Sequence, residues 1–220
     1  MIKYIFWDFN GTILDDLELS LDLLNEILVN ENKSPITKEK YLEIFGFPIR
    51  DYYKKAGIFY DDENFMRIAN YFIENYQPKS LLIDLHEGIK ELLEYFYNNG
   101  VKNICLSASE INNLEEQLKH YDIYKYFHKV IGTDNVIALG KDTLGINYLK
   151  EEKIDPKEAL YIGDTTYDYE ISKKMGIKCL LFTKGHHSIK RLKSTGAILI
   201  NNINDIIKCI KGDVENEKVF

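Results

Sequence analysis

The feature that most constrains the fold is the run of residues 3–12, which reads KYIFWDFNGT. Its β-branched and aromatic side chains predict a buried parallel strand, and Gly11 permits the tight turn that follows. In an open parallel sheet, ligands bind beyond the carboxyl ends of the strands, which is where Asp8 would lie. Asp8 is therefore a candidate nucleophile or metal ligand, although a carboxylate here can also simply cap the next turn.

The stretch that follows, roughly residues 17–78, predicts an all-helical module. Apolar residues recur there at helical spacing, and the pattern is interrupted at Pro35, at 46–48, at Gly57 and at Pro78. These breaks give four expected helices at 17–28, 37–45, 49–56 and 61–76. Because no strand pattern interrupts them, we expect a helical insert rather than part of a sheet.

From Leu81 onward, strand and helix patterns alternate. Strands are expected at 101–106, 130–132, 159–162, 177–182 and 197–200, and helices at 87–99, 110–119, 140–150 and 203–210, with one more ending at Met175. This alternation predicts an α/β fold with a doubly wound parallel sheet. We therefore assign residues 1–14 and 81–212 to an α/β core, 15–80 to an inserted helical cap, and 213–220 to a frayed tail.

Polar residues stand at the ends of several expected strands. Asp8, Ser107 and Asp164 directly follow strands, Lys141 opens a helix, and Asp168 lies four residues after Asp164. Each alone has an ordinary explanation, since a serine suits a helix N-cap and acids favour the start of a helix. Together, however, carboxylates supply the hard oxygens that Mg²⁺ prefers, and a lysine with a hydroxyl binds phosphoryl oxygens. The set predicts a Mg²⁺ and phosphate site.

These motifs, in this order, resemble those of the haloacid dehalogenase (HAD) superfamily of hydrolases, in the phosphoglycolate phosphatase-like and β-phosphoglucomutase-like branch. The motifs are the run 8–12, the strand ending at Ser107, Lys141, and the run 163–168, and the resemblance covers roughly residues 3–210. It implies a HAD-like Rossmannoid core with a helical cap. It also implies a Mg²⁺-dependent phosphatase that acts on a small phosphorylated metabolite through an aspartyl phosphate on Asp8.

The resemblance further implies a role for each site residue. The implied catalytic residues are Asp8, Asn10, Ser107 and Lys141; the implied metal ligands are Asp8, Asp164 and the backbone carbonyl of Asn10, with Asp168 beside them; and the implied substrate-binding residues are Gly11, Thr12, Ser107, Ala108, Lys141 and Arg50. Ser107 and Lys141 would form the phosphate clamp. Arg50, in the cap, would clamp a carboxylate or phosphate, although a solvated arginine opening a helix is the plain alternative.

Asn10 departs from the pattern of the phosphatases in this superfamily, which place a second Asp two residues after the nucleophile. That Asp protonates the leaving alkoxide and then activates water. An amide cannot exchange a proton near neutral pH, and acid–base catalysis typically contributes ~10²–10⁴-fold. Asn10 is thus compatible with good leaving groups and a long-lived phosphoenzyme. It also leaves open a catalytically weak protein that serves as a binding or regulatory module.

Other features narrow the function further. A nucleotide-binding domain is disfavoured because no Gly-x-Gly-x-x-Gly follows a strand, and a receiver domain because it lacks so long an insert. The formal net charge of −7 argues against nucleic acid or an anionic membrane as partner. Three widely separated cysteines indicate reduced thiols and hence a cytoplasmic protein. The pair His186-His187 is expected in a surface loop. The sequence predicts neither the substrate's identity nor the oligomeric state.

Overall fold

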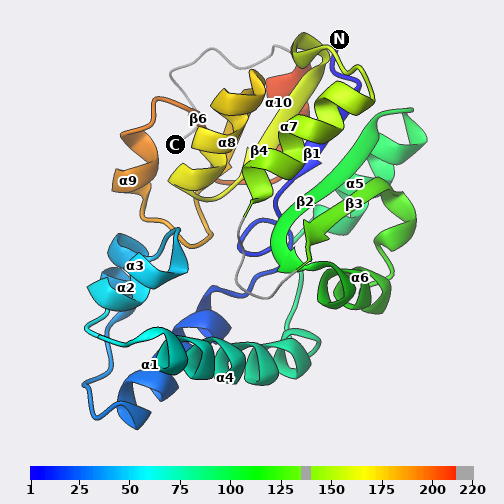
Figure 1. The fold of residues 1–220 in the computed structure, drawn as a ribbon. Coiled ribbons are helices and arrows are strands. Elements are labelled where there is room, and N and C mark those ends of the chain that lie inside the picture. Colours follow the sequence, from blue (N-terminus) through cyan, green and yellow to red (C-terminus); the bar gives the residue numbers. More distant parts are fainter. Residues whose placement is uncertain (135–139, 212–220) are drawn as a thin grey trace.

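The computed structural model describes residues 1–134 and 140–211, so the predicted tail at 213–220 lies outside the described residues. Its centre is a parallel six-stranded sheet in the order β3-β2-β1-β4-β5-β6 (Figure 1). The strands are β1 (Tyr4–Trp7), β2 (Lys102–Glu110), β3 (Phe127–Thr133), β4 (Ala159–Gly163), β5 (Lys178–Phe182) and β6 (Ile198–Ile200). The apolar run near the N-terminus therefore forms a central, buried strand, as predicted.

Helices cover both faces of the sheet. One face carries α5 (Ile89–Asn98), α6 (Ile111–His120) and α10 (Asp205–Lys211), and the other carries α7 (Lys141–Glu151), α8 (Thr166–Met175) and α9 (Ile189–Lys193); η1 (Tyr124–Tyr126) and η2 (Pro156–Glu158) are short 3₁₀ helices. Alternate residues of β1 point to opposite faces, so Ile5 and Trp7 pack on the first and Phe6 on the second. The predicted doubly wound α/β fold is confirmed.

Four further helices lie between β1 and α5, below the sheet in Figure 1. They are α1 (Leu17–Asn30), α2 (Lys38–Ile44), α3 (Ile49–Lys55) and α4 (Asp62–Ser80). We call them the helical insert. Their apolar faces form a core of their own, which includes Leu24, Tyr41 and Phe65. The four expected helices are thus present, while the division into a separate cap domain at 15–80 stays a prediction.

Pro78 does not end α4, contrary to the expectation of a helix over 61–76. A proline within a helix removes one backbone hydrogen bond. Side chains from α6 and the turn after it hold the last turn instead. Tyr121 donates its hydroxyl to the Ser80 carbonyl oxygen at 2.5 Å, and Gln117 donates its amide to the Ser80 hydroxyl at 2.7 Å. Tertiary contacts therefore extend the helix beyond the sequence signal.

Strand β2 also runs further than predicted. It continues through Ser107 to Glu110, because its pairing with β3 persists as far as Glu110 opposite Thr133. The N-cap of α6 is Glu110, whose carboxylate accepts hydrogen bonds from two backbone N–H groups in the first turn of that helix. Ser107 and Ser109 therefore lie on the strand, and neither caps the helix.

The short helix α9, which the sequence did not predict, fastens the helical insert to the core. The Arg191 guanidinium donates hydrogen bonds to the carbonyl oxygens of Leu42 and Phe45, each at 2.8 Å. These carbonyls stand at the C-terminal end of α2, where they have no helical partner and where a positive charge is favourable. Arg191 thus supplies the missing donors and holds α2 against the core.

Candidate active site

The candidate site lies at the carboxyl edge of the sheet, at its topological switch point. β2 and β3 lie on one side of β1 while β4, β5 and β6 lie on the other, so the connections from β1 and β4 diverge. Asp8 follows β1, and Asp164 follows β4. The backbone N–H of Asp8 donates to the Ile162 carbonyl oxygen at 2.8 Å, which keeps the two strand ends together. Ligands of α/β proteins bind at such points.

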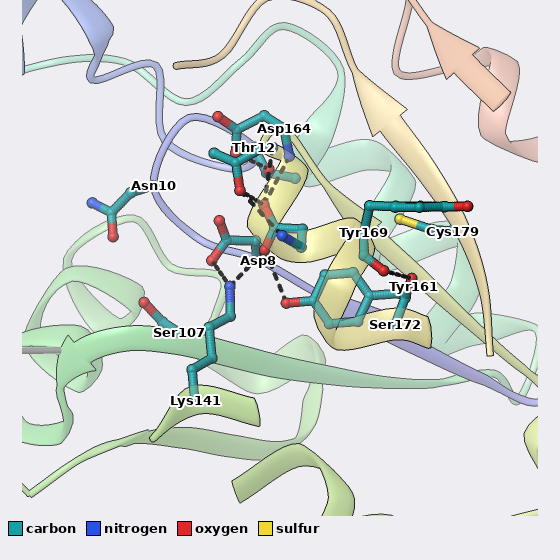
Figure 2. Close-up of polar contacts among 12 residues, drawn as sticks. Asp8, Asn10, Thr12, Ser107, Lys141, Tyr161, Asp164, Tyr169, Ser172 and Cys179 are labelled. Carbon is teal, nitrogen blue, oxygen red and sulfur yellow. Dashed lines mark hydrogen bonds and ion pairs between the residues drawn. The ribbon is translucent and has the colours of Figure 1, made fainter. Parts of the chain in front are cut away.

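Lys141 joins two of the predicted carboxylates. Its ammonium lies 2.7 Å from Asp8 Oδ1 and 2.8 Å from Asp168 Oδ1 (Figure 2). Lys141 is the first residue of α7, after Gly140, whose left-handed backbone turns the chain into the helix. Burial opposes its charge, but the carboxylates of Asp168 and Asp8 outweigh this and raise the pKa of Lys141 well above its usual range. The residue is therefore a buried, fully charged cation.

Both carboxylate oxygens of Asp168 accept hydrogen bonds from other groups of the protein. Oδ2 accepts hydrogen bonds from the backbone N–H and the hydroxyl of Thr165, at 3.0 and 2.6 Å, which caps α8. Oδ1 accepts from the Tyr161 hydroxyl at 3.1 Å as well as from Lys141. Asp168 thus positions Lys141, and it would have to release one of these bonds to serve as the metal ligand predicted from the sequence.

Asp164 is held by the loop after β1 and by the segment after β5. Its Oδ1 accepts from the Thr12 hydroxyl at 2.8 Å, and its Oδ2 accepts from the backbone N–H of His186 at 2.7 Å. Gly11 has a φ of 73°, and a Cβ at this position would lie 2.5 Å from Asp164 Oδ2. Gly11 and Thr12 therefore pack against Asp164 in this structure, and their contact with substrate stays a prediction.

The three carboxylates suit a divalent cation. Oxygens of Asp8, Asp164 and Asp168 lie within 4.8 Å of one another. Burial raises the pKa of Asp8 to about 8 and that of Asp164 to about 6, and the charge of Asp168 adds to both shifts, while Lys141 and a neighbouring histidine oppose them. Lys141 pairs with two of these buried acids, Asp8 and Asp168. A Mg²⁺ ion bound by carboxylate oxygens would balance the remaining charge, so the residues present fit this ion.

Serines at the end of β2 connect to Asn10 in the loop after β1. Ser107 Oγ accepts from the backbone N–H of Ser109 at 3.0 Å and donates to its hydroxyl at 3.1 Å. The Ser109 hydroxyl in turn donates to Asn10 Oδ1 at 3.0 Å. Figure 2 shows Asn10 and Ser107 on one side of the Asp8–Lys141 pair. The structure therefore brings together the residues of the predicted phosphate clamp, although their roles stay predictions.

The amide nitrogen of Asn10 is hydrogen-bonded to Asp16 and Tyr76, and not to Asp8, Asp164 or Asp168. Its Nδ2 donates to Asp16 Oδ2 at 3.1 Å and to the Tyr76 hydroxyl at 2.6 Å, and Figure 2 shows the amide pointing away from Asp8. Tyr76 also donates to Asp16 Oδ2, at 2.6 Å. These two bonds use both hydrogens of the Asn10 amide nitrogen. An amide does not titrate near neutral pH, so position 10 carries no proton donor or base there.

The expectation of a surface loop at His186-His187 is wrong, because both side chains are buried. His186 Nε2 lies 3.1 Å from Asp16 Oδ1, and its Nδ1 lies 2.9 Å from the Tyr41 hydroxyl oxygen. His187 Nδ1 accepts from the backbone N–H of Thr166 at 3.0 Å. Sequence reasoning missed the pair of Asp16 and His186 because the two residues are 170 positions apart and share no motif.

The Asp16–His186 pair predicts a pH-dependent stability of the metal-free protein. Burial opposes the imidazolium, but Asp16, aided by Asp164 and Asp8, raises the pKa of His186 from 6.5 to about 9. Because the folded pKa exceeds the unfolded one, this stabilisation is complete below about pH 6.5 and is lost as the pH rises through 9. Across this interval the unfolding free energy should fall by roughly 3 kcal/mol.

Urea unfolding at several pH values between about 6 and 9 measures this loss. His186→Gln should be less stable at the acidic end, and its unfolding free energy should no longer fall over this interval. A fall of equal size in the variant would assign the effect to other groups.

The structure does not bring Arg50 into the site. Its guanidinium pairs with Asp62 at 2.7 Å and lies 4.1 Å from the centre of the Phe65 ring. Its side chain is 41% exposed, and it is absent from the lining of the cavity between the helical insert and the core. This arrangement matches the plain alternative, an exposed arginine at the start of α3, and gives the predicted clamp no support.

Fold and site together define an α/β enzyme whose acids and lysine converge at the switch point of a parallel sheet. The chain belongs to the family of haloacid dehalogenase-like hydrolases, whose family model matches residues 5–182. The resemblance read from the sequence motifs is thereby confirmed.

Similar proteins agree with this assignment. Phosphoglycolate phosphatase 1 of Pseudomonas aeruginosa is 22% identical over 215 residues, which cover 94% of this chain and 79% of that protein. The crystal structure of a predicted phosphatase from Clostridium acetobutylicum has a TM-score of 0.84 at 20% identity and covers 96% of this chain and 99% of its own. The crystal structure of a predicted phosphoglycolate phosphatase from Haemophilus somnus has a TM-score of 0.77 at 17% identity. The match covers 95% of this chain and 98% of that one. At such identities these structures establish the fold.

Proposed function

We propose that the protein is a Mg²⁺-dependent phosphatase that hydrolyses a small phosphorylated substrate through an aspartyl phosphate on Asp8. The observation that carries the proposal is the buried contact between Asp8 and Lys141 beside Asp164. The Asp8 side chain is 12% exposed, so a substrate can reach it. Relatives named phosphoglycolate phosphatase support the reaction class.

In this proposal, each site residue has a task. Lys141 holds Asp8 Oδ1, and the other carboxylate oxygen attacks phosphorus as the bond to the leaving oxygen breaks. The Lys141 ammonium and the Ser107 hydroxyl bind phosphoryl oxygens and offset the repulsion between two anions. Bound by Asp8, Asp164 and the Asn10 carbonyl, Mg²⁺ would add positive charge at this point. Water then attacks the aspartyl phosphate, which releases phosphate and restores Asp8.

Asn10 sets the expected rates of these two steps. Its amide can give no proton to the leaving oxygen and can take none from the attacking water. Transfer to Asp8 is therefore fast only for leaving groups of low basicity, such as aryl or acyl oxygens. Hydrolysis of the aspartyl phosphate lacks a base for every substrate, so we expect this second step to limit turnover.

Removal of the metal, or of Asp164, should abolish activity. Hydrolysis of para-nitrophenyl phosphate is expected to require added Mg²⁺ and to fall at least about 100-fold in Asp164→Asn, since this change removes one of two carboxylate ligands. Isothermal titration calorimetry with Mg²⁺ should show binding to the wild type and weaker binding to the variant. Equal activity after exhaustive chelation would contradict the metal requirement.

The second candidate is a binding or regulatory module, and Asn10 is the observation that favours it. Such a protein would bind phosphate or a phosphorylated ligand at Lys141 without turnover. Release of phosphate from para-nitrophenyl phosphate separates the two candidates. Multiple turnovers that disappear in Asp8→Asn support the phosphatase, and binding without release supports the module.

Among residues 1–134 and 140–211, no helix is both long and apolar enough to cross a membrane. The cytoplasmic location stays a prediction.

A further inference from the structure

A cavity of about 180 Å³ lies between the helical insert and the core. Asn10, Ala108 and Ser109 line its core side, so the cavity adjoins the residues of the proposed phosphate site. Whatever is attached to a phosphoryl group at Asp8 can therefore extend into this space. The side chains of the cavity then select the leaving group.

Aromatic rings dominate the lining that the helical insert contributes. These rings include those of Tyr41, Phe45, Phe47, Tyr52, Phe72 and Tyr76. Among them, Phe72 and Tyr76 stack on each other with 5.4 Å between their ring centroids. Rings of this kind bind another ring by stacking or by edge-to-face contact. The shape and apolarity of the lining thus suit an aromatic guest.

The charges of the lining are unfavourable to an anionic guest. Among the residues that the structure describes, no lysine or arginine lines the cavity, whereas Asp16 and Glu110 do. His186 also lines it, but its imidazole is already paired with Asp16 at 3.1 Å. A carboxylate on the leaving group would enter beside Glu110 without a cation to receive it, at a cost in free energy. A glycolate-like leaving group is therefore poorly matched to this cavity.

Size and polarity limit the guest further. An apolar cavity of about 150 Å³ holds benzene, so the present cavity accommodates a single substituted ring. Gln117 also lines the cavity, is 1% exposed, and has an Oε1 atom with no hydrogen-bond partner among the described residues. A hydroxyl on the ring can satisfy this buried acceptor.

Asn10 points to the same chemistry from the reaction side. Without a proton donor at residue 10, the departing oxygen must be stable as an anion. A phenol ionises near pKa 10, as tyrosine does, whereas an alkoxide resembles water, near 15.7. A phenolate is therefore expelled far more readily than a sugar alkoxide.

We propose that the substrate is an aryl phosphate, the phosphate monoester of a phenolic ring without negative charge, with the ring seated in this cavity. The inference rests on the proposed function and names the substrate class of the same site. In the first step, the bond between Asp8 oxygen and phosphorus forms as the bond between phosphorus and the aryl oxygen breaks. The aryl oxygen leaves with the electron pair as phenolate and takes its proton from solvent.

The test compares kcat/KM for three compounds in the presence of Mg²⁺. Phenyl phosphate carries the neutral ring, para-carboxyphenyl phosphate adds a negative charge, and acetyl phosphate has a good leaving group without a ring. We expect kcat/KM for phenyl phosphate to exceed that for the carboxylated ring by about 10-fold or more, and Phe72→Ala should lower the phenyl-to-acetyl ratio by about 10-fold.

Glu110→Gln tests the charge argument. This change should lower the preference for phenyl over carboxyphenyl phosphate by several-fold. The matched control is Glu115→Gln, which lies in α6 just after Glu110 but outside the lining, and it should leave the preference unchanged. Equal or better turnover of the carboxylated ring by wild type, or a ratio indifferent to Phe72, would overturn the substrate assignment while the phosphatase stands. No turnover of any compound, acetyl phosphate included, would overturn the proposed function itself.

Discussion

Replacing Asp8 with asparagine is expected to reduce phosphatase turnover to below about 1% of the wild-type rate and to prevent formation of any phosphoenzyme. The amide keeps the shape of the carboxylate but lacks the nucleophilic oxygen anion. Loss of this group removes the covalent route. The two neighbouring carboxylates are already engaged, Asp168 by Thr165 and Lys141 and Asp164 by Thr12 and His186. Steady-state release of para-nitrophenolate is the measurement.

The same variant should fold as well as the wild type. Lys141 pairs with both Asp8 and Asp168, and it keeps Asp168 as partner when the charge at Asp8 is removed. Circular dichroism and urea unfolding provide the check. The matched control is Asp122→Asn, an exposed acid that pairs with Lys125, and it should keep full activity. Residual turnover above about 1% in Asp8→Asn would remove Asp8 from the role of nucleophile.

The change Asn10→Asp is expected to raise kcat, by up to about 10²-fold on alkyl phosphates, because it restores a proton carrier. The structure favours this gain. The new carboxyl would lie beside Asp16, since Asn10 Nδ2 is 3.1 Å from Asp16 Oδ2, and repulsion between the two acids raises the pKa of one of them. A carboxyl with a raised pKa suits a general acid. A protonated carboxyl at position 10 can donate to the Tyr76 hydroxyl, as the Asn10 amide does at 2.6 Å, which also favours the protonated form.

Steady-state rates on glycerol phosphate and phenyl phosphate measure the effect. The gain should be largest for glycerol phosphate, whose alkoxide needs a proton most, and Asn10→Ala should give none. No gain on either compound would mean that the site lacks more than one proton carrier. The binding module would then be the better description.

The sequence predicted the fold and most of the site because these depend on local patterns. Alternating apolar segments define the doubly wound sheet, and residues that follow parallel strands, such as Asp8 and Asp164, must meet at one edge. Lys141 was recognised through its motif, and the structure places it between Asp8 and Asp168. These contacts need no knowledge of how the helical insert is oriented.

The features that escaped prediction depend on contacts between separate elements. Asp16 and His186 meet only when the helical insert lies against the core, as do Arg191 and the end of α2. The guanidinium of Arg50 turns to Asp62 because that acid stands on the adjacent helix, which no motif reveals. Pairing between distant segments, rather than propensity, decided each of these positions.

Trapping the phosphoenzyme tests the central claim most directly. Wild-type enzyme with Mg²⁺ is mixed with para-nitrophenyl phosphate, quenched in acid within the first turnover, and mapped by mass spectrometry of its peptides. The account predicts a burst of nitrophenolate close to one equivalent per active site, followed by slow turnover, with the phosphoryl group on Asp8. Linear release from the first turnover, with no phosphoryl group on Asp8, would contradict it.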